Sequence, residues 1–298
     1  MRTTAATIYR DSLAAIERAS TRLLDYQRQV STGRRISRPS DDPAGTATAI
    51  RERGDVARAE QYSRTSDSAT SRLMVVDSAL SDIIEQLTHA QVSVVSAQGS
   101  EKTPAQRDVA AQALESVRDA IAGDLNTSFQ GSYLFAGADS TSPPFVIGSG
   151  GTVSAYQGST REVAVDIDTT RSATIGIDGS TISQGLAAAD VFSVLDAAAT
   201  AARSGDEAGL AQSLADLQVA FDRATNAQMR VGNNLAAMES LQTQFTDRRL
   251  AGRARVAKIE DADMAEAITG MSQADAAYRA ALGATAQITK QSLMDYLS

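Results

Sequence analysis

The most restrictive feature of the sequence is an unbroken heptad pattern between residues 73 and 97. Apolar residues recur there in alternating steps of three and four, at Leu73, Val76, Leu80, Ile83, Leu87, Ala90, Val94 and Ala97. Such spacing places them on one narrow face of an α-helix. A start at Asp42-Pro43 and an end at Gly99 predict a helix over about 44–98, on the order of 80 Å long at 1.5 Å per residue. We therefore expect a helical rod rather than a globular core.

Narrower apolar stripes of the same kind occur at both ends of the chain. One lies in residues 1–36 and the other in residues 259–298. In the second segment the heptad positions are taken by Met264, Ala267, Met271, Ala274, Tyr278, Ala281, Thr285 and Ile288. The first segment has seven arginines against three acids, a balance of +4, and the last has six acids against two bases, a balance of −4. Opposite charge favours pairing of the two ends, which we expect to lie antiparallel.

These two terminal stripes contain too few large apolar side chains to offset the conformational entropy lost when the ends become ordered. We expect both ends to be largely disordered in a free monomer and to fold when several copies bury each other's faces. The residues expected to pack between subunits are Tyr9, Leu13, Ile16, Leu23, Val30, Met264, Ile268, Met271, Tyr278, Leu282, Ile288, Leu293 and Leu297.

The middle of the chain combines further helices with one segment of different texture. Thr103-Pro104-Ala105-Gln106 predicts a capping box, followed by a helix whose apolar face contains Val109, Ala113, Val117, Ile121 and Leu125. Nearly half of residues 131–185 are Gly, Ser or Thr, which predicts a small β insertion with strands at 162–168 and 174–177 and turns at Pro143-Pro144, Gly148–Gly151 and Asp178-Gly179. Helical periodicity resumes near 189, and a long helix is expected from about 206.

The expected fold is thus mainly α, a long antiparallel helical rod or coiled coil formed by the N- and C-terminal segments. Three domains are predicted. Residues 1–40 with 260–298 would form an inner coiled coil, 41–130 with 189–259 a rod-like helical domain, and 131–188 a β-rich outer domain.

The amino-acid composition excludes several classes of function. The chain has no cysteine, and His89 is its only histidine, which excludes disulfides, thiol nucleophiles and zinc sites of the usual kinds. A formal charge of −8 argues against nucleic acid as a partner. No stretch approaches the roughly 18 apolar residues of a membrane span. Arg10 and Asp11 interrupt any signal-peptide apolar region, so no cleaved signal peptide is expected. We expect no catalytic, cofactor-binding or metal-binding residues.

Three groups of polar residues have both a functional and an ordinary interpretation. Arg248, Arg249, Arg253 and Arg255 could contact acidic faces of neighbouring subunits, or could simply be solvated near the negative end of a helix. The acids at 260, 261, 263 and 266 resemble a cation site, but favourable placement in the first turn of the terminal helix explains them better. His89 is expected on a solvated helix face.

Several short motifs resemble those of the flagellin superfamily. Residues 31–36 (STGRRI) with 40–45 (SDDPAG) are similar to its N-terminal signature, and 259–265 (IEDADMA) to its C-terminal one. Pro39 and Pro43, the segment 131–137 (GSYLFAG) and the ending 292–297 (SLMDYL) resemble the members at the hook–filament junction rather than the filament subunit itself.

The resemblance implies that the protein is an adaptor between the hook and the filament. Its expected partners are copies of itself, hook-associated protein 1, flagellin, a cytoplasmic export chaperone and the flagellar type III export apparatus. The expected location is the extracellular flagellum.

Two alternatives stay open at this point. One is a short flagellin, the filament subunit. The other, more remote, is an extracellular hydrolase whose site lies in the inserted segment. Deletion of residues 140–180 is expected to leave an adaptor able to assemble and to inactivate a hydrolase.

Overall fold

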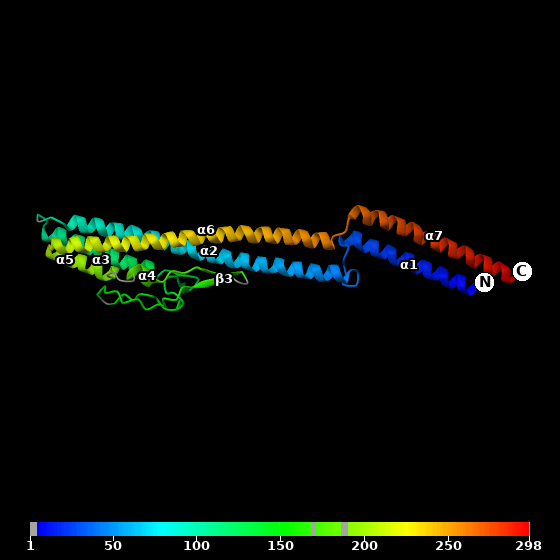
Figure 1. Cartoon of the computed structure of the whole chain (residues 1–298), viewed down its shortest axis with the longest axis horizontal. Coiled ribbons are helices and arrows are strands. Elements are labelled where there is room, and N and C mark those ends of the chain that lie inside the picture. The colour runs from blue at the N-terminus through cyan, green and yellow to red at the C-terminus, as the bar shows by residue number, and fades with distance from the viewer. Residues whose placement is uncertain (1–4, 100, 149, 169–170, 186–189, 298) are drawn as a thin grey trace. The chain divides into compact units, whose positions relative to one another are not determined.

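The computed structural model describes residues 5–99, 101–148, 150–168, 171–185 and 190–297. The chain is 73% helical, and the helices are α1 (Ala5–Thr32), α2 (Pro43–Ala97), α3 (Pro104–Leu125), α4 (Gly179–Ser183), α5 (Val191–Ser204), α6 (Glu207–Glu260) and α7 (Met264–Leu297) (Figure 1). The expected mainly α fold is confirmed. In these described ranges no helix has an apolar stretch long enough to cross a membrane.

The chain divides into two compact units. Unit 1 comprises residues 1–59 and 247–298, and unit 2 comprises residues 60–246. The inserted segment therefore belongs to the same compact unit as the helices around it. The predicted division into three functional domains stays a prediction, with boundaries that differ from those of the two units.

The apolar core of unit 2 lies among α2, α3, α5 and α6. The heptad residues of α2 from Leu73 to Ala97 are all buried, as expected from their spacing. They pack with Leu114 and Ile121 of α3 and with Leu210 and Leu217 of α6, in one continuous cluster. Burying large aliphatic side chains stabilises this unit by roughly 1.5–3 kcal/mol each.

The capping box predicted at the start of α3 is present in the structure. The side chain of Thr103 accepts a hydrogen bond from the Gln106 amide, and the Gln106 side chain accepts one from the Thr103 amide, which completes the capping box. Gly205 ends α5 in the left-handed conformation, with φ of 70°. The prediction that Val109 lies on the buried face of α3 is wrong, because its side chain is 67% exposed. The helix buries Ala110, Ala111 and Leu114 instead, because its contact with α5 is shifted around the helix.

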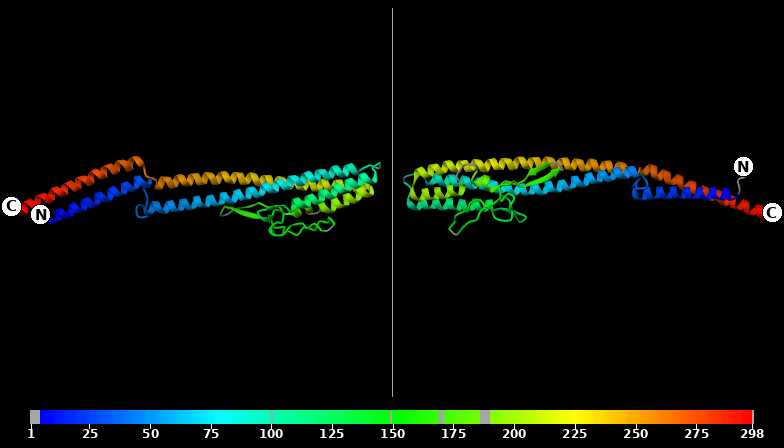
Figure 2. Two further views of the ribbon diagram at one scale, coloured as in Figure 1. Left: turned by 180° about the vertical axis from the view of Figure 1, so that it is seen from behind. Right: turned by 60° about the horizontal axis from the view of Figure 1, so that its bottom comes forward.

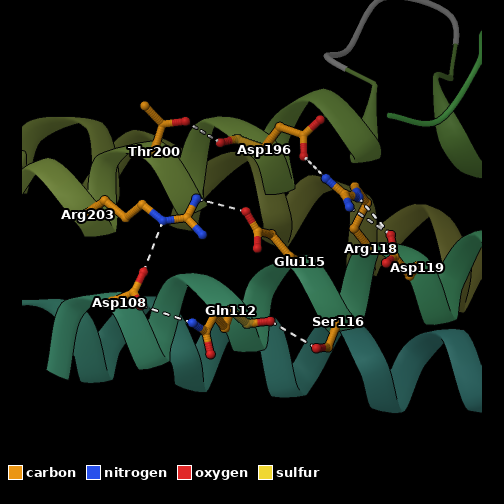
Figure 3. Close-up of polar contacts among 9 residues, drawn as sticks. All are labelled: Asp108, Gln112, Glu115, Ser116, Arg118, Asp119, Asp196, Thr200 and Arg203. Atoms are coloured by element: carbon orange, nitrogen blue, oxygen red, sulfur yellow. Dashed lines mark hydrogen bonds and ion pairs between the residues drawn. The ribbon is translucent and has the colours of Figure 1, made fainter. Parts of the chain in front are cut away.

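Polar pairs line the contact between α3 and α5 (Figure 3). Arg203 of α5 bonds Asp108 at 3.2 Å and Glu115 at 2.8 Å. Arg118 of α3 bonds Asp196 of α5 at 2.5 Å and Asp119 at 2.8 Å. The Arg203 pairs are largely exposed and contribute about 0–1 kcal/mol each, whereas the Arg118 side chain is enclosed. These pairs orient the two helices, and apolar packing supplies most of the stability.

Two small antiparallel hairpins follow α3. Strands β1 (Ser128–Phe129) and β2 (Ser132–Tyr133) pair across the turn Gln130-Gly131, and β3 (Ala164–Asp168) pairs with β4 (Arg171–Thr174). The first predicted strand is confirmed in β3, where Val165 and Ile167 share the more buried face. The second is displaced, since β4 ends at Thr174. Ile175 and Ile177 are nevertheless buried, and the Ile175 amide donates to the Val163 carbonyl.

The expected turns in the insert are partly right. Residues 147 and 153 bridge around the glycine-rich segment, and the Gly148 amide donates to the Thr152 carbonyl, as in a turn. Asp178-Gly179 is not a simple turn. Asp178 caps α4 by accepting a hydrogen bond from the Thr181 amide at 3.0 Å, because an aspartate before a glycine serves equally well as a helix cap.

Aromatic side chains join the insert to the helical core. Phe145 is 1% exposed, and its ring meets that of Phe192 of α5 edge to face at 5.1 Å between centroids. Tyr156 lies beside Phe145, and its hydroxyl is 3.0 Å from the carbonyl oxygens of Phe135 and Ser159. Burial, with the nearby charge of Asp178, raises the pKa of Tyr156 to about 12. The tyrosine therefore remains a neutral hydrogen-bond donor.

Candidate assembly surface

The two terminal helices lie side by side and antiparallel within unit 1 (Figures 1 and 2). Small residues of α7 form the contact with α1: Ala267 and Ala274 are buried, and Gly270 lies under the ring of Tyr26. A Cβ at position 270 would be 2.6 Å from that ring, so only glycine fits without movement of the tyrosine. The expected pairing of the chain ends is thus present, and it depends on small side chains rather than large ones.

The residues predicted to pack between subunits lie along this helix pair, and none with a described side chain is buried. The exposed ones are Tyr9, Leu13, Met264, Ile268 and Leu282, and the half-buried ones are Ile16, Leu23, Val30, Met271 and Tyr278. Ile288, Leu293 and Leu297 belong to α7, but their side chains are outside the described part of the structure. Leu24 of α1 is also exposed, at 60%, and was missed because it falls outside the heptad positions. A subunit-packing role for these residues stays a prediction.

The two signature motifs meet in space through their main chains. Gly33 leaves α1 with φ of 69°, and its carbonyl accepts a hydrogen bond from the Ala262 amide at 2.9 Å. In return, the Glu260 carbonyl accepts hydrogen bonds from the Arg35 and Ile36 amides, at 2.7 and 3.3 Å. These bonds connect the linker after α1 with the linker before α7. They fix the register of the two terminal helices at one end.

Side chains reinforce the same junction. Glu260 is 7% exposed and pairs with Arg53 of α2, and the Arg35 guanidinium donates to the Ile259 carbonyl at 2.8 Å. One nearby pair, between Arg255 of α6 and Glu52 of α2, spans 2.8 Å. The junction therefore contains a buried carboxylate that is paired, as a buried charge requires.

The motif at residues 40–45 turns the chain from the first linker into α2. Asp41 accepts hydrogen bonds from the amides of Ser37 and Arg38, at 3.0 and 2.8 Å. Those two bonds, from Arg38 first and then Ser37, hold the pKa of Asp41 below its ordinary value. Asp42 accepts from the Gly45 amide at 2.8 Å and so caps α2, with Pro43 at the first helical position. The side chains of both aspartates in the motif thus stabilise the local backbone by accepting hydrogen bonds from backbone amides.

The predicted charge-contact residues lie on α6. Arg248, Arg253 and Arg255 are exposed, whereas Arg249 is half-buried. Arg255 is already engaged by Glu52 within the chain, and Arg248 and Arg253 also have interactions. Contacts of these arginines with a neighbouring subunit stay a prediction.

The other candidate polar groups have structural roles. Asp263 caps α7 by accepting from the Ala265 and Glu266 amides, which confirms the helix-start interpretation there. Glu260 is different: it is the last residue of α6, not a first-turn acid of α7. His89 is exposed on α2, 3.6 Å from Glu85. Among the described residues, no group of three or more acids or histidines is arranged to hold a metal ion.

Comparison with known proteins shows which proteins this chain is similar to. Residues 5–140 match the bacterial flagellin N-terminal helical region. The chain is 24% identical to flagellar hook-associated protein 3 of Salmonella typhimurium, over 94% of each chain. It is 26% identical to the protein of the same name from Escherichia coli, over 88% of this chain and 89% of that one.

A solved structure shows the same fold. The flagellar junction protein FlgL of Legionella pneumophila superposes with a TM-score of 0.59 at 13% identity, over 72% of this chain and all of that one. Residues 5–140 thus resemble the N-terminal helical region of bacterial flagellins, and the chain is similar along nearly its whole length to flagellar hook-associated protein 3.

Proposed function

We propose that the protein is a structural subunit of the bacterial flagellum that joins hook-associated protein 1 to the flagellin filament. The observation that carries this proposal is the pair of terminal helices, which retains exposed apolar residues in a chain similar throughout to hook-associated protein 3. Such a surface suits burial between copies of the chain and its relatives. In this proposal the role is mechanical and involves no catalysis.

The path to that position is also part of the proposal. The chain would leave the cell through the flagellar type III apparatus, after a cytoplasmic chaperone has covered its C-terminal region, and without a cleaved signal peptide. The terminal helices support this route, because segments with few buried large side chains unfold at low cost. The expected location is the extracellular flagellum.

A short flagellin is the second candidate, favoured by the match of residues 5–140 to the flagellin N-terminal region. Polymerisation separates the two. Purified monomers of a junction adaptor should add to hook-derived ends that carry hook-associated protein 1 and should stop after a short layer. Monomers that seed themselves into long filaments without such ends would contradict the adaptor role.

A hydrolase site in the insert has less support. Asp178 is occupied as the cap of α4, and Asp166 lies in strand β3 opposite Ser172. Both aspartates therefore have positions that strand pairing and helix capping explain.

Reversing the charge of Arg249 and Arg253 should weaken assembly. Two Arg→Glu changes on α6 would turn attraction into repulsion if these side chains face acidic surfaces of neighbouring subunits, and we expect about a tenfold loss in affinity for hook-derived ends. Helicity of the monomer, measured by circular dichroism, should stay unchanged.

The matched control for that experiment is Lys102→Glu with Arg161→Glu, which makes the same change in net charge within unit 2. Equal assembly of the Arg249 and Arg253 double variant and the wild type would rule out the contact role of these arginines.

A further inference from the structure

Unit 2 contains a cavity of about 480 Å³ between α2 and the two hairpins. One face of α2 lines it with polar side chains three to four residues apart, from Gln61 through Arg64, Thr65 and Ser68 to Arg72. Phe129 of β1, Val165 of β3 and the buried Ile175 supply an apolar side. The cavity thus combines cations, hydroxyls and an amide with an apolar wall, as small-molecule sites commonly do.

Arg72 is the unusual member of this lining. Its Nε and Nη2 atoms are buried and have no hydrogen-bond partner in the described part of the chain. Burial lowers the pKa of Arg72, and no carboxylate among the described residues opposes this effect. Since arginine keeps its charge in proteins, Arg72 is a half-buried cation with two enclosed nitrogen atoms and no counter-ion in the described part of the chain.

Arg118 of unit 2 shows what a neutralised guanidinium looks like in this fold. Arg118 is enclosed more tightly, with 8% of its side chain exposed, and it is neutralised by Asp119 and Asp196 (Figure 3). Arg223 donates to the carbonyl oxygens of Ser183 and Gln184. An enclosed guanidinium is stabilised by an acceptor, so the two unpartnered nitrogen atoms of Arg72 suit a ligand that accepts hydrogen bonds and has negative charge.

We propose that this cavity binds an oxyanion, a carboxylate or a phosphate group, through the guanidinium of Arg72. A planar guanidinium forms two parallel hydrogen bonds with either group. Thr65 and Ser68 add hydroxyl donors from the same face of α2, and the exposed Arg64 adds positive charge at the rim. Gln130, in the left-handed conformation with φ of 52°, places its turn beside the same cavity.

The oxyanion has two possible sources. It is either a free anion from the medium or the carboxylate of an acidic side chain on a second copy of this chain, which has 36 Asp and Glu residues. Either source presents negatively charged oxygen atoms to Arg72. Binding of inorganic phosphate therefore tests whether Arg72 accepts an oxyanion ligand.

Titration of the dilute full-length protein with inorganic phosphate, followed by calorimetry at constant ionic strength, tests the site. Wild type should bind one phosphate, and Arg72→Met should weaken binding at least about tenfold, as loss of a charge-assisted pair predicts. Arg64→Met should weaken it a few-fold. Arg58→Met removes the same charge from α2 outside the cavity and should bind phosphate like the wild type.

A measurement of thermal stability without phosphate shows whether the Arg72→Met variant is folded. Because Arg72→Met replaces a half-buried, unpartnered charge by an apolar side chain of similar length, it should unfold at the same temperature as the wild type or a higher one. In phosphate at about ten times the wild-type dissociation constant, the wild type should gain about 3–6 °C, while Arg72→Met should gain no more than about 1–2 °C. No phosphate binding by the wild type, or equal binding by Arg72→Met, overturns the proposal.

Sedimentation of concentrated protein distinguishes the two sources. If an acidic side chain of a second copy fills the cavity, phosphate should reduce self-association of the wild type but not of Arg72→Met. If the ligand is a free anion, self-association should be the same with and without phosphate.

Discussion

In a dilute monomer, the backbone amides of α1 and α7 should exchange hydrogen about 1,000-fold faster than those of α3 and of α6 between residues 210 and 245. The reason is the distribution of buried side chains. The apolar cluster of the described residues runs from Ala69 to Phe245 and includes no residue of α1 or α7. In α7 the buried apolar side chains are small, at Ala267 and Ala274. Helices that bury no large apolar side chain are marginal in water, so local opening of the terminal pair is expected to cost far less free energy than opening of unit 2.

Hydrogen exchange measured by mass spectrometry on peptides from one sample provides its own control, because both units are observed in the same molecule. On addition to hook-derived ends, the amides of α1 and α7 should become protected by at least about 100-fold, while those of unit 2 should change little. Equal protection of α7 and α3 in the dilute monomer would contradict the expectation that the chain ends fold on assembly.

Two variants test whether the contact between α1 and α7 slows hydrogen exchange in these helices. Gly270→Leu places a side chain against the Tyr26 ring and should separate α1 from α7, which raises exchange in both helices. Gly283→Leu makes the same change on α7 where an added Cβ meets no atom within 4 Å, and it should leave exchange of α1 unchanged.

The helices could be predicted from the sequence because their signals are local. The heptad of α2 and the capping box at Thr103 each depend on residues within a few positions of one another. Val109 shows the limit of this reasoning. Its spacing fits the apolar face of α3, but the true face is set by the small residues of α5, such as Ala198 and Ala202, which allow close approach on one side only.

The junction between the two linkers could not be derived in the same way. Its main bonds are donated or accepted by backbone atoms of Gly33, Arg35 and Glu260, and backbone groups are the same in every residue. The pairing of Arg53 with Glu260 joins positions 207 residues apart, for which charge alone gives no partner. The resemblance to known motifs pointed to these segments as important. Only the structure shows that they contact each other.

Replacement of Phe145 by alanine should destabilise unit 2 by about 3–5 kcal/mol, the usual cost of removing a fully buried phenylalanine. The residue is 1% exposed, its ring packs on Phe192 and Tyr156, and a Cβ at Gly179 would lie 3.0 Å from its Cε2 atom. The Asn126 side chain also holds its backbone, accepting from the Phe145 amide at 3.1 Å and donating to its carbonyl at 2.8 Å.

The measurement is urea unfolding followed by far-ultraviolet circular dichroism. Val146→Ala is the matched control, because Val146 is the next residue and is 45% exposed, and it should change the free energy of unfolding by less than about 0.5 kcal/mol. A loss below about 1 kcal/mol for Phe145→Ala would show that the insert is not part of the core of unit 2.

This prediction also changes the meaning of the deletion test. Removing residues 140–180 would take Phe145, Ile167, Ile175 and Ile177 out of the core and would uncover the apolar side of Phe192. Even an adaptor with no catalytic role is then expected to lose part of its fold, so loss of function on deletion does not identify an enzyme. Point changes on exposed positions of the insert, such as Val146 and Ile147, keep the core intact and test directly whether its surface matters for assembly.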